Sequence, residues 1–273
     1  LSWGPPHNPY ELLPEEYKQY DPAEIILRDN VPDAEADLAR QRYAGYYDHI
    51  TALDRNVGRL RQGLRELGLA ENTLLVFTSD HGDMLRSHGW DEKQLPYEES
   101  ICVPFLAAQP GRLPAGLVSD VMLNVPDLMP TLLGQLGLPC PAAVEGADLS
   151  FALRGEAGVG PTSAFCSNPT PFVPNIPEWR AVRTATHTYA RTLQGPWLLF
   201  DNVADPFQLK NLVGRPEARD IQAELDAEVD TWMERTGDEG LSRAEYVARF
   251  GYNIGPNLHP VHYLQVGLHD PEP

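Results

Sequence analysis

The sequence predicts an α/β fold, and three observations support that prediction. Apolar residues spaced by three and four between residues 33 and 67 are typical of a long amphipathic helix. Residues 73–80 (TLLVFTSD) and 103–111 (VPFLAAQPG) are short apolar runs, as found in strands that are buried on both faces. A helix followed by such strands is the alternation from which α/β sheets are built.

The helix is the clearest element. It follows Pro32, with Asp33 as the expected N-cap, and Gly68 stands where a helix is expected to stop. One apolar stripe should face the core: Tyr46, Ile50, Leu53, Val57, Leu60, Leu64 and Leu67. Residues 1–32, rich in proline and aromatic side chains, predict an irregular arm.

The pattern changes near residue 150. Residues 125–139 still predict a helix that ends at Gly137. Further on, the segments WRAVRTATHTYART and WLLFDN partly alternate, as antiparallel strands do. A late amphipathic helix is expected from the spacing of Ile221, Leu225, Val229 and Trp232. The chain should therefore hold one larger and one smaller unit.

Charge narrows the choice of partners. The 273 residues contain 21 Lys and Arg against 39 Asp and Glu, a net charge of −18, which disfavours nucleic acid and anionic membranes as partners. No apolar stretch approaches the roughly 20 residues of a membrane span. We expect a soluble protein, cytoplasmic or periplasmic or secreted; the sequence decides neither the compartment nor the oligomeric state. An anionic substrate would need a metal or cationic side chains of its own.

The start of the sequence and the cysteines say little about function. The sequence begins at Leu1, with no initiator methionine and no leader. We therefore expect an interior or processed start. Cys102, Cys140 and Cys166 are few, odd in number and without metal-type spacing, so no disulfide framework is expected.

Two adjacent residues could bind a metal ion. Asp80 and His81 stand at the carboxyl end of the 73–80 run, where open α/β sheets place ligand-handling groups, and Gly82 would allow a sharp turn after them. Both residue types ligate divalent cations. The alternative is a polar turn with capping side chains, and two ligands alone do not complete a site.

Lys93 and His7 are two further candidate site residues. Lys93 would supply a fixed positive charge to an oxyanion, and its alternative is a solvated surface lysine. His7, in a loop flanked by prolines, could give a proton to a leaving oxygen, and its alternative is a surface histidine. The histidines at the end of the chain are read as surface residues: His259, His262 and His269.

Longer stretches resemble a known family. The segments GPPHNPY, NTLLVFTSDHGDMLRSHGWDEKQLPYEESICVPFL and LLFDNVADPFQLKNL occur in the order found in the C-terminal half of type I sulfatases, members of the alkaline phosphatase superfamily. The resemblance covers about residues 1–236. It implies part of an alkaline-phosphatase-like sheet sandwiched by helices in residues 1–150. A small subdomain of antiparallel sheet and helix (151–250) and a tail (251–273) would follow.

The resemblance also implies roles. Asp80 and His81 match metal ligands, Lys93 matches a lysine that contacts the sulfate, and His7 matches a histidine at the leaving-group oxygen. The implied cofactor is one divalent cation, calcium first, with manganese, magnesium or zinc as alternatives because imidazole is an unusual calcium ligand. The implied activity is hydrolysis of a small-molecule sulfate ester.

One essential part of the family pattern is missing. The nucleophile of these enzymes is a formylglycine made within C/S-x-P-x-R, and neither Cys102-Val103-Pro104 nor Ser167-Asn168-Pro169 continues to the arginine. We therefore expect a C-terminal portion that is inactive and aggregation-prone without the missing N-terminal half of the same protein. The alternatives are a phosphonate or phosphate ester hydrolase of the same superfamily and a non-catalytic sulfatase-like protein.

Overall fold

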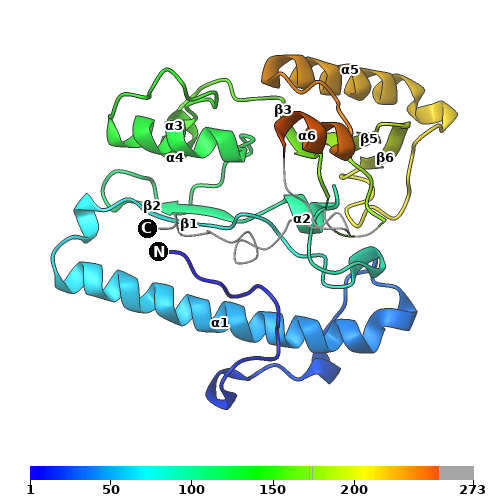
Figure 1. Cartoon of the computed structure of the whole chain (residues 1–273). Helices are drawn as coiled ribbons and strands as arrows, with labels where there is room; N and C mark the ends of the chain where they lie inside the picture. Colours follow the sequence, from blue (N-terminus) through cyan, green and yellow to red (C-terminus); the bar gives the residue numbers. More distant parts are fainter. Residues whose placement is uncertain (172, 174, 252–273) are drawn as a thin grey trace, which may run out of the picture. The chain divides into compact units, whose positions relative to one another are not determined.

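The computed structural model describes residues 1–171, 173 and 175–251 (Figure 1). The expected tail lies outside the described residues from residue 252 onward, and so do its three histidines. The chain forms two compact units. We call them the N-terminal unit (Leu1–Lys93, Tyr97–Ala164 and Pro206–Leu209) and the C-terminal unit (Gln94–Pro96, Phe165–Asp205 and Lys210 onward).

The long helix is confirmed. It is α1, Ala36–Glu66, and Gly68 follows it with a φ of 69°. Asp33 is not its N-cap, because Asp33–Glu35 forms a 3-10 turn that moves the start of the α-helix to Ala36. The prediction for Asp33 was therefore wrong by one turn, while the stop at the glycine was correct.

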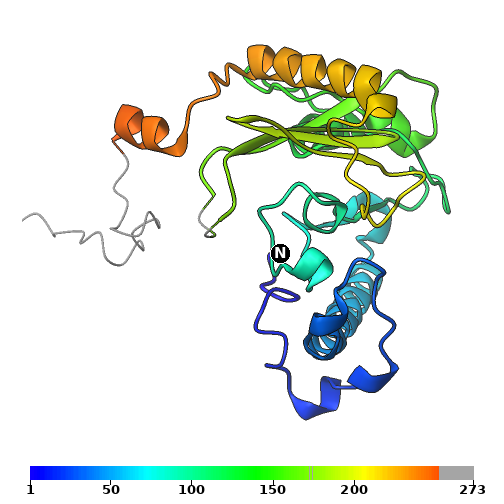
Figure 2. The ribbon, with the colours of Figure 1, turned by 90° about the vertical axis from the view of Figure 1, so that its right-hand side faces the viewer.

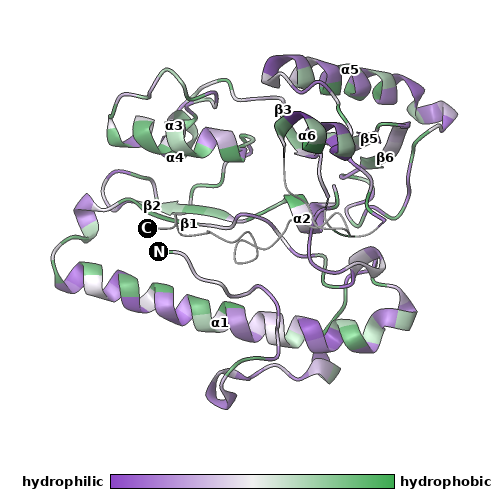
Figure 3. Ribbon diagram, viewed as in Figure 1, coloured by the Kyte–Doolittle hydropathy of each residue, from purple (hydrophilic) through white to green (hydrophobic). Residues whose placement is uncertain are grey.

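Only part of the apolar stripe of α1 is covered. Leu53 is buried, whereas Ile50 and Leu67 are exposed to 42% and 73%. The N-terminal half of the helix packs on the arm in one cluster of buried residues: Tyr10, Ile25, Ala39, Tyr43, Ala44 and Leu85. Figure 3 shows apolar residues along the whole helix, so its C-terminal half presents an apolar stripe with little cover in the described structure.

The two predicted strands form a pair. β1, Leu75–Thr78, runs antiparallel to β2, Phe105–Ala108, with Leu75 opposite Ala108. The expectation that both strands are buried was wrong, because β1 is half-buried at best and Leu106 is 64% exposed. Among the described residues the pair has no further strand on either edge.

Two short elements and one helix complete the N-terminal unit. α2, Glu98–Ile101, precedes β2, and the exposed Cys102 is its C-cap residue. α3, Val125–Leu136, begins with a capping box between Asn124 and Asp127 and ends at Gly137, as predicted. α4, Ser150–Arg154, contacts α3.

The C-terminal unit is a sheet with helices, as predicted. Its strands are β3 (Ser163–Asn168), β4 (Trp179–Thr184), β5 (His187–Thr192) and β6 (Gly195–Asp201), in that spatial order. β4, β5 and β6 pair antiparallel. The helices are α5, Arg219–Thr236, which runs along one face of the sheet (Figure 2), and α6, Arg243–Phe250.

The core of this unit is buried between the sheet and α5. Side chains from the sheet and from α5 meet in one buried cluster: Val182, Tyr189, Leu199, Ala218, Leu225 and Val229. Ile221 and Trp232 pack against it, so all four residues of the predicted helical stripe contribute. No helix in the described part of the chain is long and apolar enough to cross a membrane.

Candidate functional site

The Asp80–His81 pair follows β1 after one residue, Ser79. The Asp80 carboxylate is 84% exposed and accepts a hydrogen bond from the His81 N–H at 3.0 Å. His81 Nδ1 lies 2.7 Å from the Gly82 carbonyl oxygen, which can only accept, so Nδ1 carries the proton. His81 Nε2 is thereby left as the acceptor nitrogen, and it lies 3.7 Å from Asp80 Oδ2.

This arrangement fits a divalent cation. Two donors that each lie roughly 2.0–2.4 Å from one ion can be up to about 4 Å apart, so one cation can reach both atoms. Partial burial raises the pKa of Asp80, but His81 and nearby N–H groups lower it further, and the net pKa is below the ordinary value. Within the described ranges, no group of three or more His, Cys, Asp or Glu side chains that could hold a metal ion is found.

Gly82 allows a close approach. Its N–H donates to the Ser100 carbonyl at 2.9 Å, and a Cβ at this position would clash with the carbonyl oxygen of Glu99. Gly82 is not among the glycines with positive φ, so the expected reason for glycine here, a sharp turn, was wrong. The glycine instead lets the segment that carries His81 lie against α2.

His7 and Lys93, which are far apart in the sequence, are brought into contact within the N-terminal unit. Lys93 Nζ lies 2.8 Å from His7 Nε2, although the two residues are 86 positions apart. His7 Nδ1 donates to the Asn8 carbonyl at 2.9 Å, which leaves Nε2 facing the ammonium group. The rings of His7 and His81 lie 6.1 Å apart, so three of the four predicted site residues are neighbours and Asp80 adjoins the third.

Two further hydrogen bonds hold the arm in this position. Asn8 Nδ2 donates to Glu92 Oε1 at 2.8 Å, and the Tyr10 hydroxyl donates to Asp83 Oδ2 at 2.6 Å. Burial raises the pKa of the Asp83 carboxyl, although the Tyr10 hydroxyl bond acts the other way. Burial and Asp83 together raise the pKa of Tyr10, so it stays a neutral donor.

Sequence reasoning missed Asn8, Tyr10, Asp83 and Glu92. Each of them stands within three positions of a predicted site residue, and that proximity was the only available signal.

The loop between the Asp80–His81 pair and Lys93 has an unusual backbone. Leu85, Arg86, His88 and Glu92 all have positive φ, which is costly for residues other than glycine. Ion pairs hold it: Arg86 binds Asp91 at 2.8 Å and Glu35 at 2.7 Å. Such a strained but well-tied loop is typical of functional sites.

Comparisons with known proteins agree on one family. The sulfatase family matches residues 3–138, and the family described as N-sulphoglucosamine sulphohydrolase, C-terminal, matches residues 86–235, more than half of the chain. The chain therefore belongs to the sulfatase family.

Curated relatives extend this result. An ulvan-active sulfatase of Formosa agariphila is 40% identical over 272 residues, covering 97% of this chain and 53% of that protein. An endo-4-O-sulfatase of Bacteroides thetaiotaomicron is 33% identical, covering 87% of this chain and 51% of that protein. The chain thus spans about half the length of the curated relatives it matches.

Solved structures confirm the fold. The protein yidJ from Bacteroides fragilis superimposes with a TM-score of 0.76 at 30% identity, covering 89% of this chain and 54% of that chain. A relative in complex with its substrate D-glucosamine-2-N,6-O-disulfate gives a TM-score of 0.69 at 27% identity, with 78% and 44% covered. The phosphonate monoester hydrolase of Silicibacter pomeroyi gives 0.66 at 27%, with 82% and 47% covered.

Proposed function

We propose that this chain is the C-terminal part of a metal-dependent sulfatase, and that the full-length protein hydrolyses sulfate esters. The contact between Lys93 Nζ and His7 Nε2, 2.8 Å across 86 positions, is the observation that carries the proposal. It joins a permanent cation and a proton-transfer group beside the Asp80–His81 pair. That combination suits the transfer of a tetrahedral anion from oxygen.

Lys93 would bind the sulfate group. Its side chain is only 18% exposed, and Glu92 Oε2 lies 3.7 Å from its ammonium nitrogen. A partly desolvated ammonium attracts an anionic oxygen more strongly than one in bulk water. It would stabilise negative charge on the sulfate oxygens in the transition state, and it supplies the local positive charge that a protein of net charge −18 otherwise lacks.

His7 would act as the general acid. Its Nδ1 is held by the Asn8 carbonyl, so Nε2, which contacts Lys93 in this structure, is the nitrogen left to face the ester once Lys93 binds the sulfate. As the bond between sulfur and the ester oxygen breaks, the electron pair stays on that oxygen. Once Nε2 of His7 is released from Lys93 and carries a proton, it gives that proton to the oxygen, and the product leaves as a neutral alcohol.

Asp80 and His81 would hold a divalent cation together with ligands from outside this chain. When bound, the cation polarises the sulfate oxygens and neutralises charge as a Lewis acid. Calcium is the family expectation, whereas the imidazole ligand favours manganese or zinc. The nucleophile also lies outside this chain, because the sequence has no C/S-x-P-x-R motif.

The His7 role predicts a dependence on the leaving group. In the full-length protein, His7→Ala should lower kcat about a hundredfold or more on a sugar sulfate, whose alkoxide leaves poorly. On 4-nitrophenyl sulfate, whose leaving group needs no proton, the loss should be much smaller. Equal losses on both substrates would contradict the general-acid role.

Lys93 is tested in the same protein. Lys93→Ala should lower kcat/KM about a hundredfold on both substrates, since the sulfate is common to them. Lys18→Ala removes a lysine that pairs with the exposed Glu15 and should leave kcat/KM unchanged. Unchanged rates in Lys93→Ala would remove the basis of the proposal.

Chelation followed by titration with calcium, manganese, magnesium or zinc would identify the ion.

A phosphonate or phosphate ester hydrolase is the second candidate. It is favoured by the histidine beside Asp80 and by the likeness to a phosphonate monoester hydrolase. Rates on matched aryl sulfate, phosphodiester and phosphonate substrates distinguish the two. A full-length sequence without C/S-x-P-x-R upstream would favour the non-catalytic alternative instead.

The N-terminal half of such a protein would be the main partner. β2 and α3 expose large apolar side chains, including Leu106, Val125 and Met129. Monomeric proteins rarely leave apolar faces of this kind uncovered. We therefore expect residues 1–273 alone to associate in light-scattering measurements, and to become monodisperse when co-expressed with the N-terminal half. A monodisperse monomer without it would contradict this.

A further inference from the structure

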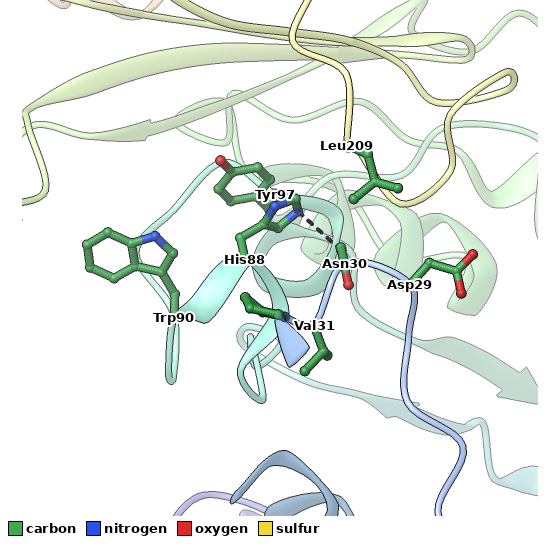
Figure 4. A pocket seen from close by; sticks show the side chains of 8 residues that line it. Asp29, Asn30, Val31, His88, Trp90, Tyr97 and Leu209 are labelled. Carbon is green, nitrogen blue, oxygen red and sulfur yellow. Dashed lines mark hydrogen bonds between the residues drawn. The ribbon is translucent and has the colours of Figure 1, made fainter. Parts of the chain in front are cut away.

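A hollow lies in the N-terminal unit, and its lining includes none of the four residues assigned above. It has a volume of about 450 Å³ and is shown in Figure 4. Four separate segments line it, and the lining includes Asp29, Asn30, His88, Trp90, Tyr97 and Leu209. No local sequence pattern connects these residues, and the proposed chemistry does not use them.

The walls of the hollow are fixed. Asn30 is 4% exposed, and its Nδ2 lies 2.7 Å from Glu99 Oε1, 3.0 Å from the Phe207 carbonyl oxygen and 3.1 Å from His88 Nε2. The His88 N–H also donates to the Asn30 carbonyl at 2.7 Å. The His88 ring stacks on Tyr97 with centroids 4.1 Å apart. A hollow with walls held in this way is largely formed before a ligand arrives.

The lining indicates which ligands would fit. Trp90, half-buried, offers an aromatic surface on one side of the stacked pair of His88 and Tyr97, and the exposed carboxylate of Asp29 lies on the other side (Figure 4). None of the eight lining residues is Lys or Arg. An anionic group would be repelled by Asp29 without compensation, whereas a ring with an apolar face and hydroxyl donors matches both features. A neutral sugar ring has that character.

The position of Trp90 relates the hollow to the proposed sulfate site. Trp90 precedes Lys93 by three positions, so their Cα atoms are at most about 11 Å apart. Both residues belong to the loop of the N-terminal unit that the ion pairs of Arg86 hold. A substrate whose sulfate contacts Lys93 could therefore extend to Trp90 if it continues beyond the sulfated unit.

We propose that this hollow is a subsite for an unsulfated sugar unit of an oligosaccharide substrate, an inference that rests on the proposed sulfatase function. Stacking on Trp90 would position the ring, and Asp29 would accept a hydrogen bond from one of its hydroxyl groups. The subsite selects sulfated oligosaccharides over small sulfate esters.

Two substrates and three variants of the full-length protein test this. The substrates are a sulfated oligosaccharide prepared from ulvan and 4-nitrophenyl sulfate. Trp90→Ala should raise KM for the oligosaccharide about tenfold, as expected for a lost aromatic contact, and leave kcat/KM on 4-nitrophenyl sulfate within about twofold. Trp90→Phe should restore most of the affinity, which a merely unfolded loop would not allow.

Asp29→Asn distinguishes a neutral from a cationic ligand group, because the amide keeps an acceptor and loses the charge. A change in KM below about threefold supports the sugar subsite, and a loss as large as that of Trp90→Ala overturns it. Equal losses on both substrates in Trp90→Ala, or no change on either, also overturn it. Hydrolysis of 4-nitrophenyl sulfate without turnover of the oligosaccharide refutes the subsite alone, whereas inactivity of the wild type on both refutes the sulfatase function itself.

Discussion

The two sheets of this chain contain similar residues but differ in how far they are covered. In the C-terminal unit, Val182, Tyr189 and Leu199 are fully buried between the strands and α5. In the N-terminal unit, β1 and β2 pair with each other while Leu106 remains 64% exposed. An apolar run therefore predicts a strand from local pattern, whereas its burial depends on elements that are distant in sequence.

The largest expected effect comes from exchanging one leucine in each sheet. Leu199→Ala should lower the stability of the C-terminal unit by about 2–5 kcal/mol, because a buried side chain leaves a cavity. Leu106→Ala should change the stability of residues 1–273 by less than about 0.5 kcal/mol, because the side chain is exposed. Hydrogen exchange of the β5–β6 and β1–β2 peptides measures both locally.

The same pair of variants sharpens the comparison in the full-length protein. If an N-terminal half covers β2, Leu106→Ala should cost more there than in residues 1–273, while the cost of Leu199→Ala stays the same. An equal, small effect of Leu106→Ala in both proteins would show that β2 faces solvent in each.

A buried ion pair also stabilises the C-terminal unit. Arg180, with a side chain 4% exposed, donates to both carboxylate oxygens of Asp238 at 2.8 Å, and the Tyr246 hydroxyl donates to Asp238 as well. Asp238→Asn leaves a buried guanidinium without its counter-charge and should cost about 3 kcal/mol. Urea unfolding at pH 7 measures this, with Glu239→Gln, next to it and exposed, as the control that changes little.

This pair also predicts a pH dependence. Burial raises the pKa of Asp238, but Arg180, the Gly240 N–H and Tyr246 lower it further, so the folded-state pKa lies below the ordinary value of 3.8. The stabilisation is therefore complete above about pH 5 and is lost as the pH falls through the folded-state pKa. Asp238→Asn should lack this contribution between pH 5 and 3. A variant that follows the wild-type curve would assign the acid sensitivity to other carboxylates.

A smaller effect on stability is expected at Gly82, where the segment that carries His81 lies against α2. Gly82→Ala places a Cβ against the Glu99 carbonyl oxygen, so the backbone must shift, at a cost of about 1–3 kcal/mol. Because His81 is adjacent, the same variant should weaken metal binding, measured by calorimetry with manganese in the full-length protein. Normal stability and affinity would mean that the loop and α2 separate without cost.

Sequence reasoning succeeded where the signal was local. Strands β4, β5 and β6 and helix α5 follow from alternation and spacing, and Asp80 and His81 are neighbours in the chain. The contact between His7 and Lys93 spans 86 positions, and only a family resemblance suggested that they share a site. The hydrogen bonds that fix the arm, from Asn8 to Glu92 and from Tyr10 to Asp83, join ordinary polar residues whose pairing no local pattern encodes.

A small gain in stability tests whether the C-terminal half of α1 has a partner. A Cβ at Gly58 would meet no atom within 4 Å in the described structure, and the residue lies inside α1. Gly58→Ala should therefore stabilise residues 1–273 by about 0.5–1 kcal/mol, since glycine loses more backbone entropy than alanine on entering a helix. Thermal unfolding measures the gain. A loss of stability in the full-length protein, against a gain in residues 1–273, would place another segment directly on this helix face.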